Sequence, residues 1–138
     1  MDITKYTLTN KKGASVTLSS LGACITSIIV PDKDGKLEDV VLGYKDEASW
    51  MADGPCAGKC PGRYANRIAK GHLEIDGKIY SLPINNGPNH LHGGPEGFQN
   101  KIWDSRRDGD AVEFMYYSED GEQGYPGNLK VVARYEWS

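Results

Sequence analysis

A two-residue period in hydrophobicity constrains the fold of this chain more than any other feature of its sequence. Short runs rich in β-branched residues occur at residues 6–9, 15–18, 24–30 and 40–44. Successive side chains of a strand point to opposite faces, so runs of this kind suit strands with one buried face. Gly, Asn, Asp and Pro interrupt the runs at residues 10–13, 21–22 and 31–35. The pattern predicts an antiparallel all-β fold.

The clearest local signal is a hairpin across residues 72–82, with Asp76-Gly77 at its turn. An Asp-Gly pair tolerates the positive φ angles of a type I′ turn, whose twist matches that of the flanking strands. Alternation along the two strands predicts which side chains face the packed side. These are Leu73, Ile75, Ile79 and Leu82.

Further elements are predicted toward the C-terminus. Residues 102–107 and 111–117 form a second hairpin with a turn near Asp108-Gly109, and residues 129–137 form another strand. Only residues 46–51 have the pattern of a helical turn.

Composition limits the number of domains and the kinds of partner. The 138 residues, of which 38% are hydrophobic, suffice for one modest core and not for a second domain. A formal net charge of -3 provides no basic surface for nucleic acid or an anionic membrane. A neutral small molecule is the expected ligand.

The N-terminus and the cysteines indicate a cytoplasmic location. Residues 1–8 lack the basic and apolar regions of a secretory signal, and the longest aliphatic run, at residues 28–30, is far shorter than a membrane span. Three cysteines cannot all pair within one chain, which favours reduced thiols. Cys56 and Cys60 have a spacing that zinc sites use, but two further ligands would be needed, so no metal is expected.

Gly and Pro concentrate at residues 54–71, 87–97 and 121–127, and such long loops on a sheet are common places for binding sites. In the first loop, Asn66 and Arg67 combine an amide with a fork of N–H donors, which suits vicinal hydroxyl groups. The alternative is an arginine in a surface salt bridge beside an asparagine in a left-handed turn.

The second loop contains His90 and His92. In an extended segment both imidazoles would lie on one face, which leaves three interpretations open. They are two ligands of a metal, an acid/base or hydrogen-bonding group for a sugar oxygen, and a loop imidazole that caps backbone groups. Gly54 and Lys59 do not have the spacing of a phosphate-binding loop, so no nucleotide site is expected.

Four segments together resemble the N-terminal part of the aldose 1-epimerase (galactose mutarotase) family. They are residues 62–71, 76–78, 85–97 and 120–127. The resemblance implies an antiparallel β-sandwich of the galactose mutarotase-like supersandwich type, incomplete in this chain. Residues 1–138 would then be the N-terminal part of a single domain.

The resemblance also implies an activity. Members of this family interconvert the α and β anomers of aldohexoses such as galactose and glucose by general acid/base ring opening, without a cofactor. By correspondence with the family's motifs, Asn66, Arg67 and His92 bind the sugar, and His92 is an auxiliary catalytic group that helps polarise the ring oxygen. His90 has no assigned role.

The departures from the family pattern lead to further expectations. The family's proton-donating histidine and its base glutamate have no counterpart here, so we expect sugar recognition with little catalysis. A partial sandwich leaves sheet edges and apolar surface uncovered, which predicts self-association. Two alternatives stay open: a noncatalytic carbohydrate-binding β module, and a hexose-6-phosphate 1-epimerase relative. The latter would use cations near the loops, with Lys59, Arg63 and Lys70 as candidates.

Overall fold

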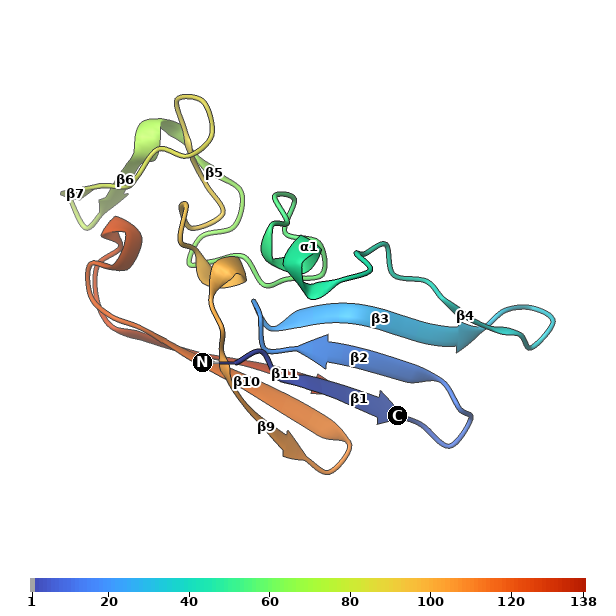
Figure 1. Ribbon diagram of the computed structural model, residues 1–138. Helices are drawn as coiled ribbons and strands as arrows, with labels where there is room; N and C mark the ends of the chain where they lie inside the picture. The colour runs from blue at the N-terminus through green and yellow to red at the C-terminus, as the bar shows by residue number, and fades with distance from the viewer. Residues whose placement is uncertain (1) are drawn as a thin grey trace.

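Two antiparallel sheets form the body of the molecule in the computed structural model, which describes residues 2–138 (Figure 1). The first sheet has the strand order β1-β2-β3-β4 and the second has the order β11-β10-β9. The strands of the first sheet are β1 (Lys5–Thr9), β2 (Ser15–Ser19), β3 (Cys24–Pro31) and β4 (Leu37–Asp39). Those of the second are β9 (Asp104–Asp108), β10 (Ala111–Ser118) and β11 (Leu129–Glu136). The prediction of an antiparallel all-β fold is confirmed.

The core lies between these sheets. Apolar side chains of β1 and β2 meet those of β10, and the aromatic rings of Phe98 and Trp103 close the same cluster. Leu18, Val112 and Phe114 are fully buried, and each such side chain contributes roughly 1.5–3 kcal/mol to folding. The two-residue period is therefore the signature of strands with one face in this core.

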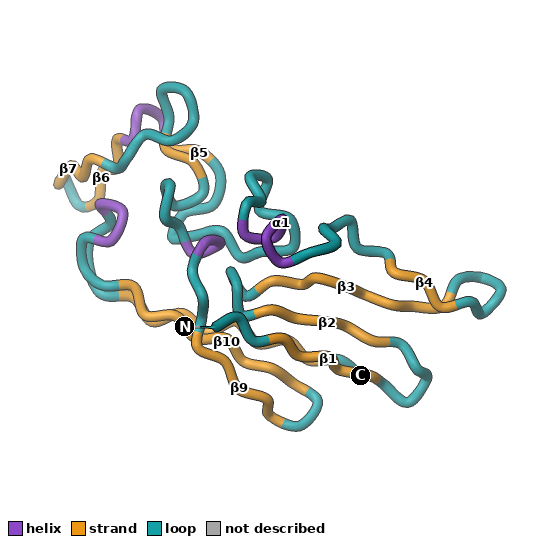
Figure 2. The backbone as a smooth tube through the Cα atoms, viewed as in Figure 1, coloured by secondary structure: helices purple, strands orange, loops and turns teal. Residues whose placement is uncertain are grey.

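Smaller elements and long loops form a lobe beside the ends of the two sheets, and most of this lobe is loop (Figure 2). Two short strand pairs organise it, β5 with β8 and β6 with β7. The strands are β5 (Arg67–Ile68), β6 (His72–Ile75), β7 (Lys78–Ser81) and β8 (His90–Leu91). The helical turns are α1 (Glu47–Met51), η1 (Ala69–Gly71), η2 (Phe98–Asn100) and η3 (Glu122–Gly124).

The β6–β7 hairpin has the predicted turn but not the predicted packing. Asp76 and Gly77 have φ angles of 50° and 74°, as a two-residue loop of this type requires. Ile75 pairs with Lys78 and Glu74 pairs with Ile79, so Ile79 lies on the opposite face from Ile75. Both isoleucines are exposed, at 42% and 58%, and the prediction that they pack is wrong; Leu82 is buried as predicted.

A strand predicted at residues 40–44 is also wrong. Pairing with β3 ends at Asp39, and the chain then leaves the sheet, with Leu42 93% exposed. The segment packs instead against α1, where the indole of Trp50 donates a hydrogen bond of 3.0 Å to the carbonyl of Tyr44. Gly43 allows this approach, because a Cβ there would lie 2.6 Å from the Trp50 ring.

The remaining predicted elements are confirmed with small shifts. The β9–β10 hairpin turns at Gly109 and Asp110, one residue later than predicted. The helical turn α1 begins after Asp46, whose carboxylate caps it by accepting a hydrogen bond of 2.8 Å from the Ser49 N–H. Within residues 2–138, no helix has the length and apolar character required to span a bilayer.

Candidate functional site

Asn66 and His92 lie side by side because β5 pairs with β8. Arg67 is opposite Leu91 in that ladder, which places the residue before β5 next to the residue after β8. The His92 N–H donates to the Asn66 carbonyl at 3.0 Å, and the Asn66 N–H donates to Nδ1 of His92 at 2.9 Å. Since Nδ1 accepts, the neutral ring has its proton on Nε2. His92 therefore offers a ligand an Nε2–H donor in a fixed orientation.

Arg67 is held by amide oxygens. Its Nε donates to Oδ1 of Asn86 at 2.9 Å, and one terminal nitrogen donates to Oδ1 of Asn66 at 3.2 Å. No ion pair to Arg67 occurs within the described residues, which argues against the salt-bridge interpretation. Asn66 does have a left-handed backbone, with φ of 68°. The guanidinium is exposed and keeps further N–H groups for a ligand.

A cavity of about 270 Å³ adjoins this cluster, and His92 and Asn86 are in its wall. Asn85 fixes one side of the cavity, because its side-chain amide both donates to the carbonyl and accepts from the N–H of Leu91. The volume lies near the lower end of the range for small-molecule sites, roughly 300–1,000 Å³. The other lining residues are Asp53, Gly54, Cys56, Leu91, Gly94, Pro95, Gln99 and Asn100.

His90 has a structural role. Its side chain is fully buried, with Nδ1 2.7 Å from the Pro83 carbonyl and Nε2 2.6 Å from the Tyr125 hydroxyl. A carbonyl can only accept, so Nδ1 donates to it and Nε2 accepts from Tyr125. The condition under which both imidazoles would share one face, an extended segment, is not met, because β8 ends at Leu91 and His92 has φ of 50°.

The metal interpretations gain no support. Within residues 2–138, no group of three or more His, Cys, Asp or Glu side chains is arranged to hold a metal ion. All three cysteines are free thiols. Burial raises the pKa of Cys24 to about 12, with smaller effects from neighbouring charges, so this thiol is protonated at neutral pH.

Two of the three cations considered for phosphate binding are engaged within the protein. Arg63 donates to the carbonyl oxygens of Ser118, Glu119 and Pro126, and its guanidinium lies 5.9 Å from the centre of the Tyr125 ring. Lys59 is buried, donates to the Trp50 carbonyl at 2.7 Å and lies 3.5 Å from the Asp53 carboxylate. Only Lys70 stays exposed.

The sequence motifs do not assign the residues that hold the site residues and their segments in place through hydrogen bonds. Asn86 orients Arg67, and Tyr125 fixes the segment that contains His90. For Asn86, the sequence does contain an indication: the amide pair Asn85-Asn86 before a glycine is typical of turns whose side chains bind nearby backbone. Tyr125 lies in the family-like segment at residues 120–127, but nothing in the sequence assigns it a role.

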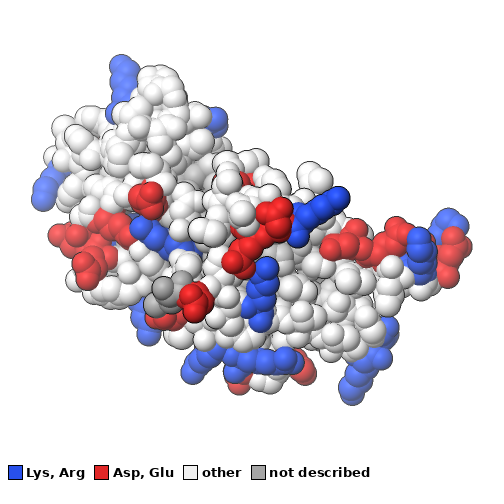
Figure 3. All heavy atoms as spheres, viewed as in Figure 1, with Lys and Arg blue, Asp and Glu red and all other residues white. Residues whose placement is uncertain are grey.

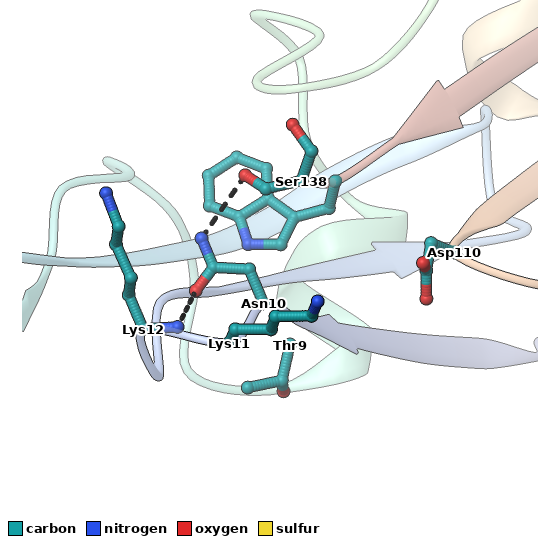
Figure 4. Close-up of a pocket in the computed structure, with 7 residues that line it drawn as sticks. Thr9, Asn10, Lys11, Lys12, Asp110 and Ser138 are labelled. Carbon is teal, nitrogen blue, oxygen red and sulfur yellow. Dashed lines mark hydrogen bonds between the residues drawn. The ribbon is translucent and has the colours of Figure 1, made fainter.

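A second, larger cavity lies elsewhere. It has a volume of about 510 Å³ and is lined by the β1–β2 turn, Asp110 and the last two residues (Figure 4). Asn10, one of the lining residues, donates to the Ser138 carbonyl at 3.3 Å and accepts from the Lys12 N–H at 3.0 Å. None of Asn66, Arg67 or His92 lines it.

Acidic and basic side chains are interspersed on the face of the molecule shown in Figure 3.

Comparison with known proteins identifies the family. The family model of aldose 1-epimerases matches residues 4–137. The chain belongs to the aldose 1-epimerase family. It is 48% identical over 120 residues to galactose mutarotase from Bos taurus, and 40% identical over 136 residues to aldose 1-epimerase from Escherichia coli. These matches include 87% and 94% of this chain but only 35% and 38% of the two relatives.

Solved structures of the family share the fold. The GalM/aldose epimerase homologue from C. elegans superimposes with a TM-score of 0.92 at 36% identity. Galactose 1-epimerase from Lactobacillus acidophilus gives 0.81 at 31% identity. Each match covers 98% of this chain and 42% or 43% of the solved chain. The predicted galactose mutarotase-like β-sandwich is confirmed, and this chain spans less than half the length of its relatives.

Proposed function

We propose that this chain provides the sugar-binding part of an aldose 1-epimerase that acts on aldohexoses such as galactose and glucose. The observation that supports this most directly is the paired backbone of Asn66 and His92, with Arg67 bonded to Asn66 and with His92 in the wall of the 270 Å³ cavity. Three polar side chains in fixed orientations match the alternating donors and acceptors of vicinal hydroxyl groups.

The proposed chemistry follows from the tautomer of His92. An Nε2–H donor directed at the ring oxygen of the sugar favours the charge that develops there as the C1–O5 bond breaks. Arg67 and Asn66 hold neighbouring hydroxyls and keep the ring in place. Residues 1–138 contain no counterpart of the family's proton-donating histidine and base glutamate, so we propose that this chain alone binds sugar and catalyses little.

The alternatives fit less well. A hexose-6-phosphate epimerase needs free cations near the site, and Arg63 and Lys59 are occupied by protein carbonyl and carboxylate oxygens, which leaves only Lys70 of the three candidates exposed. A noncatalytic binding module finds no support in the relatives, which are named as galactose mutarotases and aldose 1-epimerases.

A titration with D-galactose followed by ¹H–¹⁵N NMR tests the proposal. We expect saturable shifts at Asn66, Arg67 and His92, and affinity at least tenfold weaker in Arg67→Ala and His92→Ala, because each loses a positioned polar contact. Exposed residues of the same types, Arg107 and His72, give matched control variants that should bind like the parent chain. Equal binding by all four variants would rule out this site.

Polarimetry of freshly dissolved α-D-galactose tests the catalytic part. We expect acceleration by a chain extended to the length of its relatives and little by residues 1–138. Acceleration by neither chain would contradict the epimerase assignment.

Two further properties are proposed for the chain. Exposed apolar side chains such as Val132 on β11 and Leu42 after β4 support self-association through uncovered surfaces. The three free thiols support a reducing, cytoplasmic setting. That residues 1–138 are one part of a single domain stays a prediction.

A further inference from the structure

Gln99 has a buried polar atom without a partner. The residue is only 4% exposed, and within residues 2–138 its Oε1 accepts no hydrogen bond. A buried acceptor of this kind costs free energy, and native proteins rarely keep one unless it serves another purpose. Gln99 also lines the 270 Å³ cavity that contains His92.

The surroundings of the amide place it beside the candidate site. A Cβ at Gly97 would lie 2.7 Å from both Oε1 and Nε2 of Gln99 and 2.6 Å from the carbonyl oxygen of His92. The amide therefore lies over the glycine backbone, in space that only a residue without a side chain leaves open. The backbone of Gln99 is held by packing against Gly22, where a Cβ would lie 2.5 Å from the Gln99 carbonyl oxygen.

We propose that Gln99 is a sugar-positioning residue whose amide oxygen accepts a hydrogen bond from a hydroxyl group of an aldohexose bound beside His92. The inference rests on the proposed function and extends its site to η2. The last torsion of a glutamine side chain is broad and nearly two-fold, so the amide can turn until its oxygen faces the cavity. A sugar hydroxyl then satisfies the acceptor that is unpaired in the free protein.

Side-chain amide signals provide the first test. The sequence contains two glutamines, Gln99 and Gln123, so a ¹⁵N-labelled chain gives two glutamine NH₂ pairs, which Gln99→Leu assigns. During a D-galactose titration we expect the Gln99 pair to shift with the same dissociation constant as His92. Gln123, whose Oε1 already accepts from the Glu96 N–H at 3.2 Å, is the internal control and should not move.

The Gln99→Leu variant provides the second test. Leucine keeps much of the volume and removes the unpaired acceptor, so the free variant should melt at the same temperature as the parent chain or higher. Its affinity for D-galactose should fall by about fivefold or more, as expected for one lost hydrogen bond.

The outcomes separate this inference from the proposed function. A lower melting temperature with unchanged affinity would show that Gln99 is purely structural and overturn the inference. Galactose shifts at His92 without shifts at Gln99 would also overturn it while leaving the proposed function intact. No galactose shifts at either residue would remove the proposed function as well.

Discussion

Two histidines that are two positions apart have opposite environments. Both ring nitrogens of His90 form hydrogen bonds, to Pro83 and Tyr125. In His92 only Nδ1 does, by accepting from a backbone N–H. The difference arises from one backbone angle, because the left-handed conformation of His92 ends the strand and turns its ring away from the buried face. Sequence spacing alone cannot reveal such a reversal.

The His90–Tyr125 pair leads to a stability prediction. In Tyr125→Phe, Nε2 of the buried imidazole loses its donor, and we expect the free energy of unfolding to fall by about 1–3 kcal/mol. Urea unfolding measures this change. Tyr117→Phe is the matched control, since Tyr117 is 55% exposed and should lose almost nothing. Equal stability of the two variants would contradict the role given to this hydrogen bond.

The thiols should differ in reactivity. Cys24 is 1% exposed and its pKa is about 12, so both accessibility and thiolate content are low. We expect iodoacetamide at pH 8 to modify Cys24 only after unfolding, and Cys56, which is partly exposed, to react in the folded protein. Peptide mass spectrometry reads out each site. Rapid native labelling of Cys24 would be inconsistent with its burial.

At the scale of elements, the short ladder between β5 and β8 depends on a close backbone approach. A Cβ at Gly93 would lie 1.5 Å from the Gly62 carbonyl oxygen, in the turn that follows His92. No side chain fits there without separating the two loops. The position of His92 therefore depends on its neighbour having no side chain.

Gly93→Ala should consequently disrupt the candidate site and destabilise the chain by more than about 3 kcal/mol, as expected for a severe steric conflict. Gly77→Ala is the matched control. Gly77 also has a positive φ, of 74°, but its Cβ would meet nothing within 4 Å, so the expected loss is only about 1 kcal/mol. Thermal unfolding of both variants compares them, and similar losses would refute the steric argument.

The turn η3 is tied to β10 through Glu122, whose carboxylate accepts hydrogen bonds from Tyr116 and Ser118. Burial by itself would raise the pKa of Glu122, but these bonds and Lys101 outweigh it and hold the pKa below its ordinary value of 4.5. A lowered folded-state pKa stabilises the protein above the ordinary value, and this contribution is lost as the pH falls through the folded-state pKa.

Glu122→Gln should therefore be less stable than the parent chain at neutral pH, by about 1–2 kcal/mol, and the two curves should converge as the pH falls through the folded-state pKa, which lies below 4.5. Denaturant unfolding at a series of pH values measures the difference. A constant difference across the range would show that the charge of Glu122 does not contribute.

Much of the fold was predictable because strand period and turn residues are local properties. The Asp76-Gly77 turn follows from the positive φ angles that this pair tolerates, and the cap of α1 follows from the Asp46 carboxylate, which bonds to nearby backbone. The exposure of Ile79 and the exit of residues 40–44 from the sheet depend on cross-strand pairing and on contact with Trp50, which no local pattern encodes. Likewise the motifs of the sequence are enough to propose Asn66, Arg67 and His92 as site residues, whereas Gln99 is proposed from an acceptor that has no partner among residues 2–138.

At the scale of the whole molecule, the uncovered surfaces predict concentration-dependent association. Val132, on the edge strand β11, is 50% exposed. We expect sedimentation or size-exclusion analysis to show larger species at higher concentration, and Val132→Lys to shift the distribution toward monomer. Thr9→Lys adds the same charge at an exposed polar position of β1 and should have little effect. A monomer that resists concentration would argue against self-association.

The arrangement of the core also determines when this chain can fold. The apolar side chains of the first sheet, Leu8, Val16 and Leu18, pack in one cluster with Val112 and Phe114, which follow about a hundred residues later in the sequence. Further ties between distant segments join Trp137 to the Ala14 carbonyl and Tyr135 to the Ala23 carbonyl. During synthesis the strands of the first sheet leave the ribosome before β10 has been made. At ordinary translation rates their apolar face therefore stays exposed for several seconds. The first sheet thus cannot complete its core until β10 has been synthesised.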